Sequence, residues 1–329
     1  MGSPSTAVGH TPSTRTHAGL VLAASVFGIS WAAPLIRLSS APPLVIAAWR
    51  LLIAEAVLLV ILLGRGEWRA WRTVRVRDHM IAAGAGAMLA LHFWSWNASL
   101  SYTTIAASVV LVNLQPAIGA IGSVLLLKEK TTRRQVVGML VGMLGALVVT
   151  APAIMAVNAV SATTAAHPAP AFWLLPTAMF GDLLAVIGAI TAALYYLAGR
   201  QLRATLDLVP YVALVYGWCT LALFGLAFVR QEPLWGWGAP DWAIFAGLAA
   251  GPMLLGHTGM NWALRHLPAH VVNLTVLGEP VGAAVLAMLI PAIGERPDGW
   301  TIAGGALILG GAIWALGSPG VGEGGAKVE

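Results

Sequence analysis

Residues 268–293 read PAHVVNLTVLGEPVGAAVLAMLIPAI, and this run decides the class of fold. It is longer than the roughly 20 apolar residues that a helix needs to cross a bilayer core. Its one carboxylate is Glu279, and Pro280 follows directly. A charge at that depth costs on the order of 2.5–3.5 kcal/mol, and proline removes a helix hydrogen bond that lipid cannot replace. The run therefore predicts a membrane helix that is broken at an acid and borders a wet or protein-lined space.

The run has an earlier counterpart in the chain. Asn261–Pro280 reads NWALRHLPAHVVNLTVLGEP and Asn97–Pro116 reads NASLSYTTIAASVVLVNLQP, and one offset of 164 aligns them without a gap. The polar positions carry this match, because apolar positions agree easily by chance. The alignment places the amide of Gln115 on the acid of Glu279. The chain therefore contains a repeat in which only one copy could titrate at this position.

The composition predicts an integral membrane protein whose partners are the lipid bilayer and a small-molecule substrate. Of 329 residues, 58% are apolar and 9% are charged, whereas a soluble domain carries about 25% charged residues. The formal charge of +5 reports membrane orientation and is no nucleic-acid footprint. Cys219 is the only cysteine, which excludes an intrachain disulfide. No P-loop, H-E-x-x-H or Cys/His cluster occurs, so we predict no ATP site, no metal site and no cofactor.

The predicted fold is an all-α integral membrane protein with ten transmembrane helices, arranged as two inverted five-helix repeats. An odd number of spans in each half makes the halves enter the membrane in opposite directions. The expected spans are 19–36, 43–63, 80–100, 104–127, 135–154, 180–199, 208–229, 241–264, 268–293 and 299–316.

The predicted domain organisation follows these spans. Residues 1–17 are expected to form a disordered cytoplasmic tail and 317–329 a flexible cytoplasmic tail. The first five-helix repeat covers 18–154 and the second covers 180–316, and residues 155–179 between them are expected to form an external linker.

The basic residues predict the orientation in the cell membrane. With the N-terminus in the cytoplasm, 14 Lys and Arg residues fall on the inside and three on the outside. Cytoplasmic loops carry an excess of basic residues, so we expect both termini to be cytoplasmic. The three outside residues are Arg37, Arg230 and Arg296.

Three charged residues lie deep within predicted spans: Arg50, Glu55 and Glu279. Glu279 is either a structural acid that is hydrogen-bonded between helices or a site for substrate or a coupling proton. The proton role is chemically suitable because removal of a carboxylate from water favours its neutral form. Arg50 either ties helices together or serves function. It lies about 140° around its helix from Glu55, so the two do not face each other, and Glu55 is expected to pair with another helix.

Two polar pairs occupy corresponding places in the two halves. His92 and Trp96 share one helix face at i, i+4, as do His257 and Asn261. Each histidine alone is as readily explained by structural packing, but the matched positions favour two faces that line one central cavity.

Aromatic and glycine residues within spans complete the pattern. Trp31, Trp96 and Tyr195 are candidates for an aromatic pocket, with core packing as the alternative reading for each. Gly138 and Gly142 form a GxxxG pattern, which favours close helix packing.

The two copies end in related signatures. "NLQP" leads to Lys128-Glu129-Lys130 in the first, and "LGEP" leads to "GER" at Gly294–Arg296 in the second. With ten spans in two repeats, this resembles the EamA family of the drug/metabolite transporter superfamily over about residues 18–316. The family's usual "GER" is "KEK" in the first copy.

The resemblance implies efflux of small molecules or amino acids through a cavity between the repeats. The substrate-binding residues that we expect on this basis are Trp31, His92, Trp96, Asn113, Gln115, Tyr195, His257, Asn261 and Glu279, and the coupling or structural charges are Glu279, Arg50 and Glu55.

The predicted function is a secondary active transporter that exports small organic metabolites such as amino acids, aromatic ones among them, by alternating access. We expect no enzyme activity and a monomer or homodimer. The alternatives are a membrane-embedded enzyme for lipid-linked substrates, for which no catalytic cluster is evident, and a non-transporting membrane interaction protein.

Overall fold

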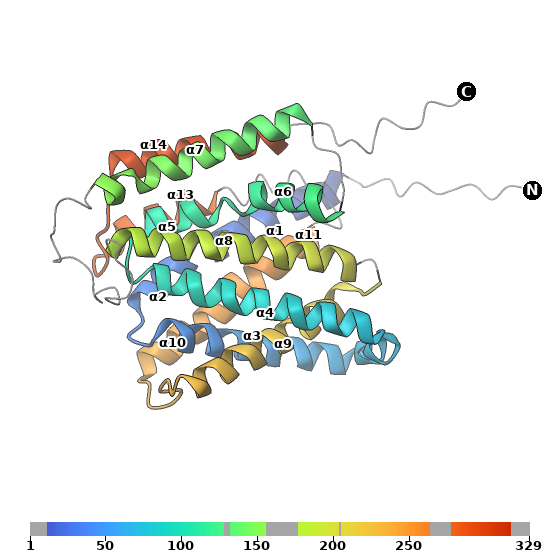
Figure 1. Cartoon of the computed structure of the whole chain (residues 1–329). Coiled ribbons are helices and arrows are strands. Elements are labelled where there is room, and N and C mark those ends of the chain that lie inside the picture. The colour runs from blue at the N-terminus through green and yellow to red at the C-terminus, as the bar shows by residue number, and fades with distance from the viewer. Residues whose placement is uncertain (1–11, 128–131, 156–176, 204, 264–277, 317–329) are drawn as a thin grey trace, which may run out of the picture.

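A computed structural model describes residues 12–127, 132–155, 177–203, 205–263 and 278–316, and every regular element within these ranges is a helix (Figure 1). The elements are α1 (Pro12–Ser30), α2 (Ala32–Leu38), α3 (Pro43–Gly64), η1 (Glu67–Thr73), α4 (Val76–Ser99), α5 (Ile105–Val112), α6 (Gln115–Leu127), α7 (Arg133–Met155), α8 (Thr177–Leu202), α9 (Leu208–Val229), α10 (Ala239–Leu248), η3 (Ala249–Thr258), α11 (Gly259–Ala263), α13 (Glu279–Leu289) and α14 (Gly299–Leu316).

Four helical stretches are long and apolar enough to cross a membrane. They are Gly19–Leu38, Pro43–Gly64, Thr177–Gly199 and Leu208–Val229, and shorter apolar helices accompany them. The all-helical membrane class is therefore confirmed.

The helices break where the repeat carries its prolines. The predicted span 104–127 is two helices, because α5 ends at Val112 and α6 begins at Gln115. In the second copy α13 begins at Glu279, and residues 268–277 of the predicted span lie outside the described ranges. Each helix start has proline as its second residue, where the missing N–H would have no intrahelical acceptor.

Two further predicted spans differ from single α-helices. The first is divided at Trp31, and α1 begins at Pro12, so residues 12–17 are helical although the sequence analysis assigned them to a tail. Proline suits the first position of a helix. The span predicted at 241–264 is α10, then the π-helix η3 around Pro252, then α11. A proline inside a helix removes a backbone donor, which favours such a local change of winding.

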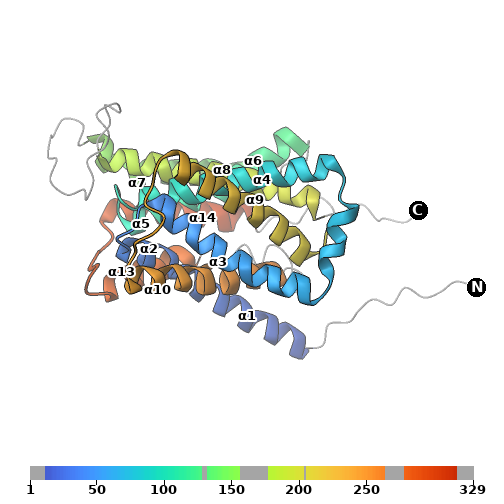
Figure 2. The ribbon, with the colours of Figure 1, turned by 90° about the horizontal axis from the view of Figure 1, so that it is seen from below.

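Helices from the two halves of the chain pack against each other throughout the bundle. The contacting pairs are α3 with α9, α5 with α13, α7 with α14, α4 with α8, and α1 with η3. Figure 1 shows α7 and α14 along one side, and Figures 1 and 2 both show α3 and α10 side by side on another. Among the described helices, the most extensive interfaces therefore join the two halves.

Glycine permits the closest of these approaches. A Cβ atom at Gly145 of α7 would lie 2.6 Å from the carbonyl oxygen of Gly304 in α14, and one at Gly311 would lie 2.5 Å from that of Gly138. Small residues let two membrane helices approach to backbone contact. The prediction of close packing at Gly138 is confirmed.

Candidate functional site

A buried guanidinium lies in the middle of the bundle. Arg50 of α3 is 1% exposed, and its Cζ lies 3.9 Å from the centroid of the Phe93 ring on α4. Its Nε has no hydrogen-bond partner, and Arg50 makes no ion pair within the described ranges. A charged side chain inside a membrane protein usually pairs with an acid or marks a pathway. The arrangement thus presents an uncompensated positive charge to the bundle interior.

Two histidines from different halves of the chain lie near this charge. His92 of α4 and His257 of η3 are both within electrostatic range of Arg50 and of each other. The ring of His92 donates from Nδ1 to the carbonyl oxygen of Gly188 on α8, at 2.9 Å, because a carbonyl can only accept. The other ring nitrogen of neutral His92 is then an acceptor. The structure thus brings together Arg50, His92 and His257, which we call the inner cluster.

Trp96 extends the inner cluster along α4. Its ring is parallel to that of His92, with 6.1 Å between the ring centroids. Its indole Nε1 is buried without a hydrogen-bond partner. Gly188 permits this packing, because a Cβ atom there would lie 3.3 Å from Cβ of Trp96. Trp96 therefore offers an unused donor beside His92.

The neighbour of Glu55, which the sequence left open, is α9. Glu55 is 5% exposed, and a Cβ atom at Gly217 of α9 would lie 3.6 Å from Glu55 Oε1. Its Oε2 has no hydrogen-bond partner. Glu55 and Arg50 form no ion pair with each other, in agreement with their angular separation on the helix.

The repeat positions lie at helix ends. Glu279 and Gln115 are half-buried first residues of α13 and α6. An acid at a helix N-terminus is stabilised by the exposed N–H groups and the helix dipole. Glu279 also interacts electrostatically with Tyr196 of α8. Asn113 caps the end of α5, where its Nδ2 donates to the carbonyl oxygen of Val109 at 2.8 Å, which explains how that side chain is held.

The remaining predicted site residues are more dispersed. Tyr195 is buried and hydrogen-bonded to Tyr211 of α9. Trp31 stands at the α1–α2 break with its ring against Phe27 at 6.1 Å, and no contact joins it to the inner cluster within the described part of the chain. Asn261 belongs to α11, and its side chain is outside what the structure describes.

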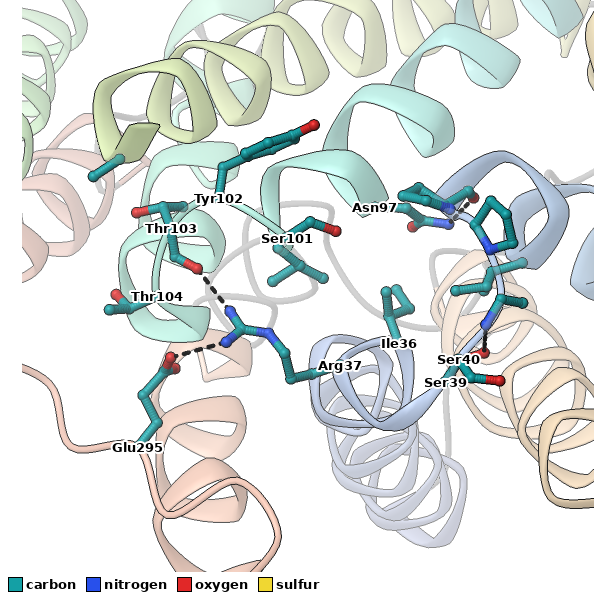
Figure 3. Close-up of a pocket in the computed structure, with 16 residues that line it drawn as sticks. Ile36, Arg37, Ser39, Ser40, Asn97, Ser101, Tyr102, Thr103, Thr104 and Glu295 are labelled. Atoms are coloured by element: carbon teal, nitrogen blue, oxygen red, sulfur yellow. Dashed lines mark hydrogen bonds and ion pairs between the residues drawn. The ribbon is translucent and has the colours of Figure 1, made fainter. Parts of the chain in front are cut away.

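Sequence reasoning missed a polar network at one end of the bundle. At this end α2 and α4 finish and α5, α8 and α10 start, and we call it the outer end because the sequence predicts that it faces outside. Arg37 Nη1 lies 3.3 Å from Glu295 Oε1, and Arg37 Nη2 donates to the carbonyl oxygen of Thr103 at 2.6 Å (Figure 3). Glu295 Oε2 accepts from the backbone N–H of Ile105 at 2.6 Å. Glu295 therefore joins the chain after α13 to α2 and to the start of α5.

Two more acids join the halves at the outer end. Asp241 of α10 accepts hydrogen bonds from the hydroxyls of Ser39 and Ser40, both at 2.6 Å. Asp182 of α8 accepts from the Thr103 hydroxyl at 2.8 Å. The only sequence signal for this network was Glu295 in the charged pair that closes the second copy.

The described residues do not point to metal chemistry. Among them, no group of three His, Cys, Asp or Glu side chains is placed to hold a metal ion. What the site offers is a set of buried donors with two acids, Glu55 and Glu279, in an apolar bundle, which suits recognition of a polar molecule.

Comparison with known proteins agrees with this reading. The model of the EamA-like transporter family matches the chain twice, over residues 15–151 and 179–317. The chain belongs to the EamA-like transporter family. A Bacillus subtilis (strain 168) relative named "Uncharacterized transporter YyaM" is 24% identical over 282 residues, which cover 82% of this chain and 83% of that protein. A crystal structure at 22% identity covers 92% of this chain and 97% of its own, with a TM-score of 0.57, which indicates the same fold.

As an EamA-like protein, the chain is a membrane transporter in class. The resemblance inferred from "NLQP" and "LGEP" is thereby confirmed. The family match does not assign roles to individual residues, so the site residues stay predictions.

Proposed function

We propose that this EamA-like protein is a secondary active transporter that exports small organic metabolites, such as amino acids, across the cytoplasmic membrane. The observation that carries the proposal is the inner cluster, in which Arg50, His92 and His257, from three helices, lie within electrostatic range of one another. Ionisable residues inside a bundle are costly and mark substrate or ion pathways. A bundle that served only as an anchor would gain nothing from them.

Alternating access between two inverted repeats is the mechanism that we propose. Counted along the predicted spans, the second packs on the seventh, the fourth on the ninth and the fifth on the tenth, while the third packs on the sixth and the eighth on the first. If each span of one half is exchanged with its counterpart in the other half, the same set of contacting pairs results. The pattern supports two related halves that rock about a central site.

Glu279 is the residue that we propose for proton coupling. It is an acid at the start of a helix after a break, and its counterpart Gln115 cannot titrate. Export driven by a proton gradient requires a group that binds and releases a proton once in each cycle. With one acid and one amide at equivalent positions, only the second half would carry the proton.

Flux in proteoliposomes tests the proposal. Glu279→Gln keeps the shape and hydrogen-bonding capacity but removes the titration. We expect this variant to fold, bind substrate and exchange substrate for substrate, but to lose accumulation driven by an imposed pH gradient. Gln115→Leu should instead weaken binding and coupling together, and Glu232→Gln in the exposed Arg230–Glu232 pair is the matched control.

Each outcome of this assay has a definite meaning. Full gradient-driven accumulation by Glu279→Gln would overturn the proton role and return Glu279 to a structural acid. Absence of flux for every amino acid and aromatic metabolite, in well-folded wild-type protein, would overturn export of this class of molecule.

A further inference from the structure

A pocket opens at the outer end, on the outer side of the inner cluster. Its volume is about 660 Å³, which lies within the usual range of ligand pockets, roughly 300–1,000 Å³. The end of α2, the turn before α3, the end of α4 and the turn before α5 line it, and Glu295 closes one side (Figure 3). Within the described part of the chain, the charged residues that line it are Arg37 and Glu295.

Two lining residues hold polar atoms that the protein itself leaves unpaired. Arg37 uses its two terminal nitrogens for Glu295 and Thr103, and its Nε is buried without a partner. Asn97, which is 0% exposed, donates from Nδ2 to the carbonyl oxygen of Pro43 at 3.1 Å, but its Oδ1 has no partner. Buried polar groups in native proteins are normally hydrogen-bonded. One unused donor and one unused acceptor therefore belong to residues that line the same pocket, and a ligand in the pocket reaches these buried atoms when the two side chains turn toward it.

The charges around the pocket select the kind of ligand. The carboxylate of Glu295 balances the guanidinium of Arg37, so the lining is close to neutral as a whole. A ligand with a net charge would leave that charge uncompensated, whereas a zwitterion would not. Its carboxylate would accept from Arg37 Nε, and its ammonium would donate to Asn97 Oδ1. The side chain of Ser101 lies between these two residues in Figure 3 and offers a further hydroxyl.

We propose that this outer pocket is a second binding site, which takes a small zwitterion of the α-amino acid class on its way out of the transporter. The inference rests on the proposed export function and extends it. The pocket adjoins the inner cluster along two helices: Ile46, which lines the pocket, is one turn of α3 before Arg50, and Asn97 directly follows Trp96 on α4. A molecule that leaves the inner cluster toward the outside thus meets the pocket next.

Protection of a single thiol tests the second site. The natural sequence has one cysteine, the buried Cys219, so Cys219→Ala gives a background without thiols. In that background Ser101→Cys places a thiol in the pocket, and Ala239→Cys places one on the exposed start of α10, outside the pocket lining. A membrane-impermeant maleimide is applied from outside to proteoliposomes with each common L-amino acid in turn present on both sides of the membrane, and flux of the same amino acid is measured in parallel from vesicles loaded with it.

We expect at least one amino acid to slow the labelling of Ser101→Cys, by about tenfold at a concentration ten times its Kd. Analogues without the carboxylate or without the amine, such as phenethylamine and 3-phenylpropanoate for L-phenylalanine, should give no protection, and Ala239→Cys should be labelled at one rate throughout. Arg37→Lys keeps a charge for Glu295 but has no Nε donor, so it should remove the protection.

The opposite results overturn the inference and are separable from failure of the transport proposal. Flux without protection, or equal protection by the analogues, means that the pocket holds water only and leaves the export proposal intact. Protection that survives Arg37→Lys refutes the assigned contact. Protection by an amino acid without flux of any would keep the binding site and overturn transport instead.

Discussion

Replacement of Arg50 by methionine should stabilise the protein while it abolishes transport. Arg50 is 1% exposed, and within the described ranges it has no acid partner, only the face of the Phe93 ring. If Arg50 instead held the helices together, its replacement would lower the stability of the protein. The substitution therefore separates a residue kept for function from one kept for the fold.

The magnitude follows from the contacts of Arg50. Burial of an ion costs several kcal/mol even after relaxation, and an unpaired buried donor such as Nε costs about 1–3 kcal/mol. The cation–π contact with Phe93, at 3.9 Å and shielded from water, offsets about 2 kcal/mol of this burial cost. Replacement of buried charges by apolar residues of similar volume is often neutral or stabilising by about 1–4 kcal/mol. We expect the free energy of unfolding of Arg50→Met to rise within that range.

Reversible unfolding in mixed detergent micelles measures this difference, and proteoliposome flux measures the activity. Arg65→Met at the exposed end of the same helix is the matched control and should change the free energy of unfolding by no more than about 0.5 kcal/mol. If Arg50→Met lost more than about 2 kcal/mol while the control did not, Arg50 would be a structural tie between helices. Full transport by a stable Arg50→Met would equally refute the reasoning.

Three further predictions concern packing, the outer network and topology. Gly86→Ala would place a Cβ atom 2.6 Å from Cβ of Trp218 and should lower the free energy of unfolding by about 1–3 kcal/mol. Gly84 lies on the same helix with open space around it, so Gly84→Ala should raise the free energy of unfolding by up to about 1 kcal/mol. Glu295→Gln keeps an acceptor for the start of α5 but loses the ion pair, so thermal unfolding should show a loss of about 1 kcal/mol, and an unchanged stability would contradict this account. Reporter fusions at residues 165 and 325 should lie on opposite sides of the membrane, the second in the cytoplasm, and finding both on one side would exclude the inverted repeats.

The sequence alone determined the membrane class and the family. Transfer of apolar side chains from water depends on local composition, so the runs at 43–63 and 208–229 could be recognised without knowledge of their neighbours, and α3 and α9 agree with them within one residue. The start of α13 at Glu279 and Pro280 is equally local, because proline lacks a donor wherever it stands. The division of the predicted span 104–127 before Pro116 was found only in the structure.

Only the tertiary structure decided which polar groups meet. A helix that is apolar on all sides does not reveal from its sequence which face packs on protein and which on lipid. The meeting of Arg50 with His257 depends on the packing of α3 on η3, and the pair of Arg37 with Glu295 joins residues 258 positions apart. For the same reason the neighbour of Glu55 could not be predicted, and the packing of α3 on α9 shows that it is Gly217.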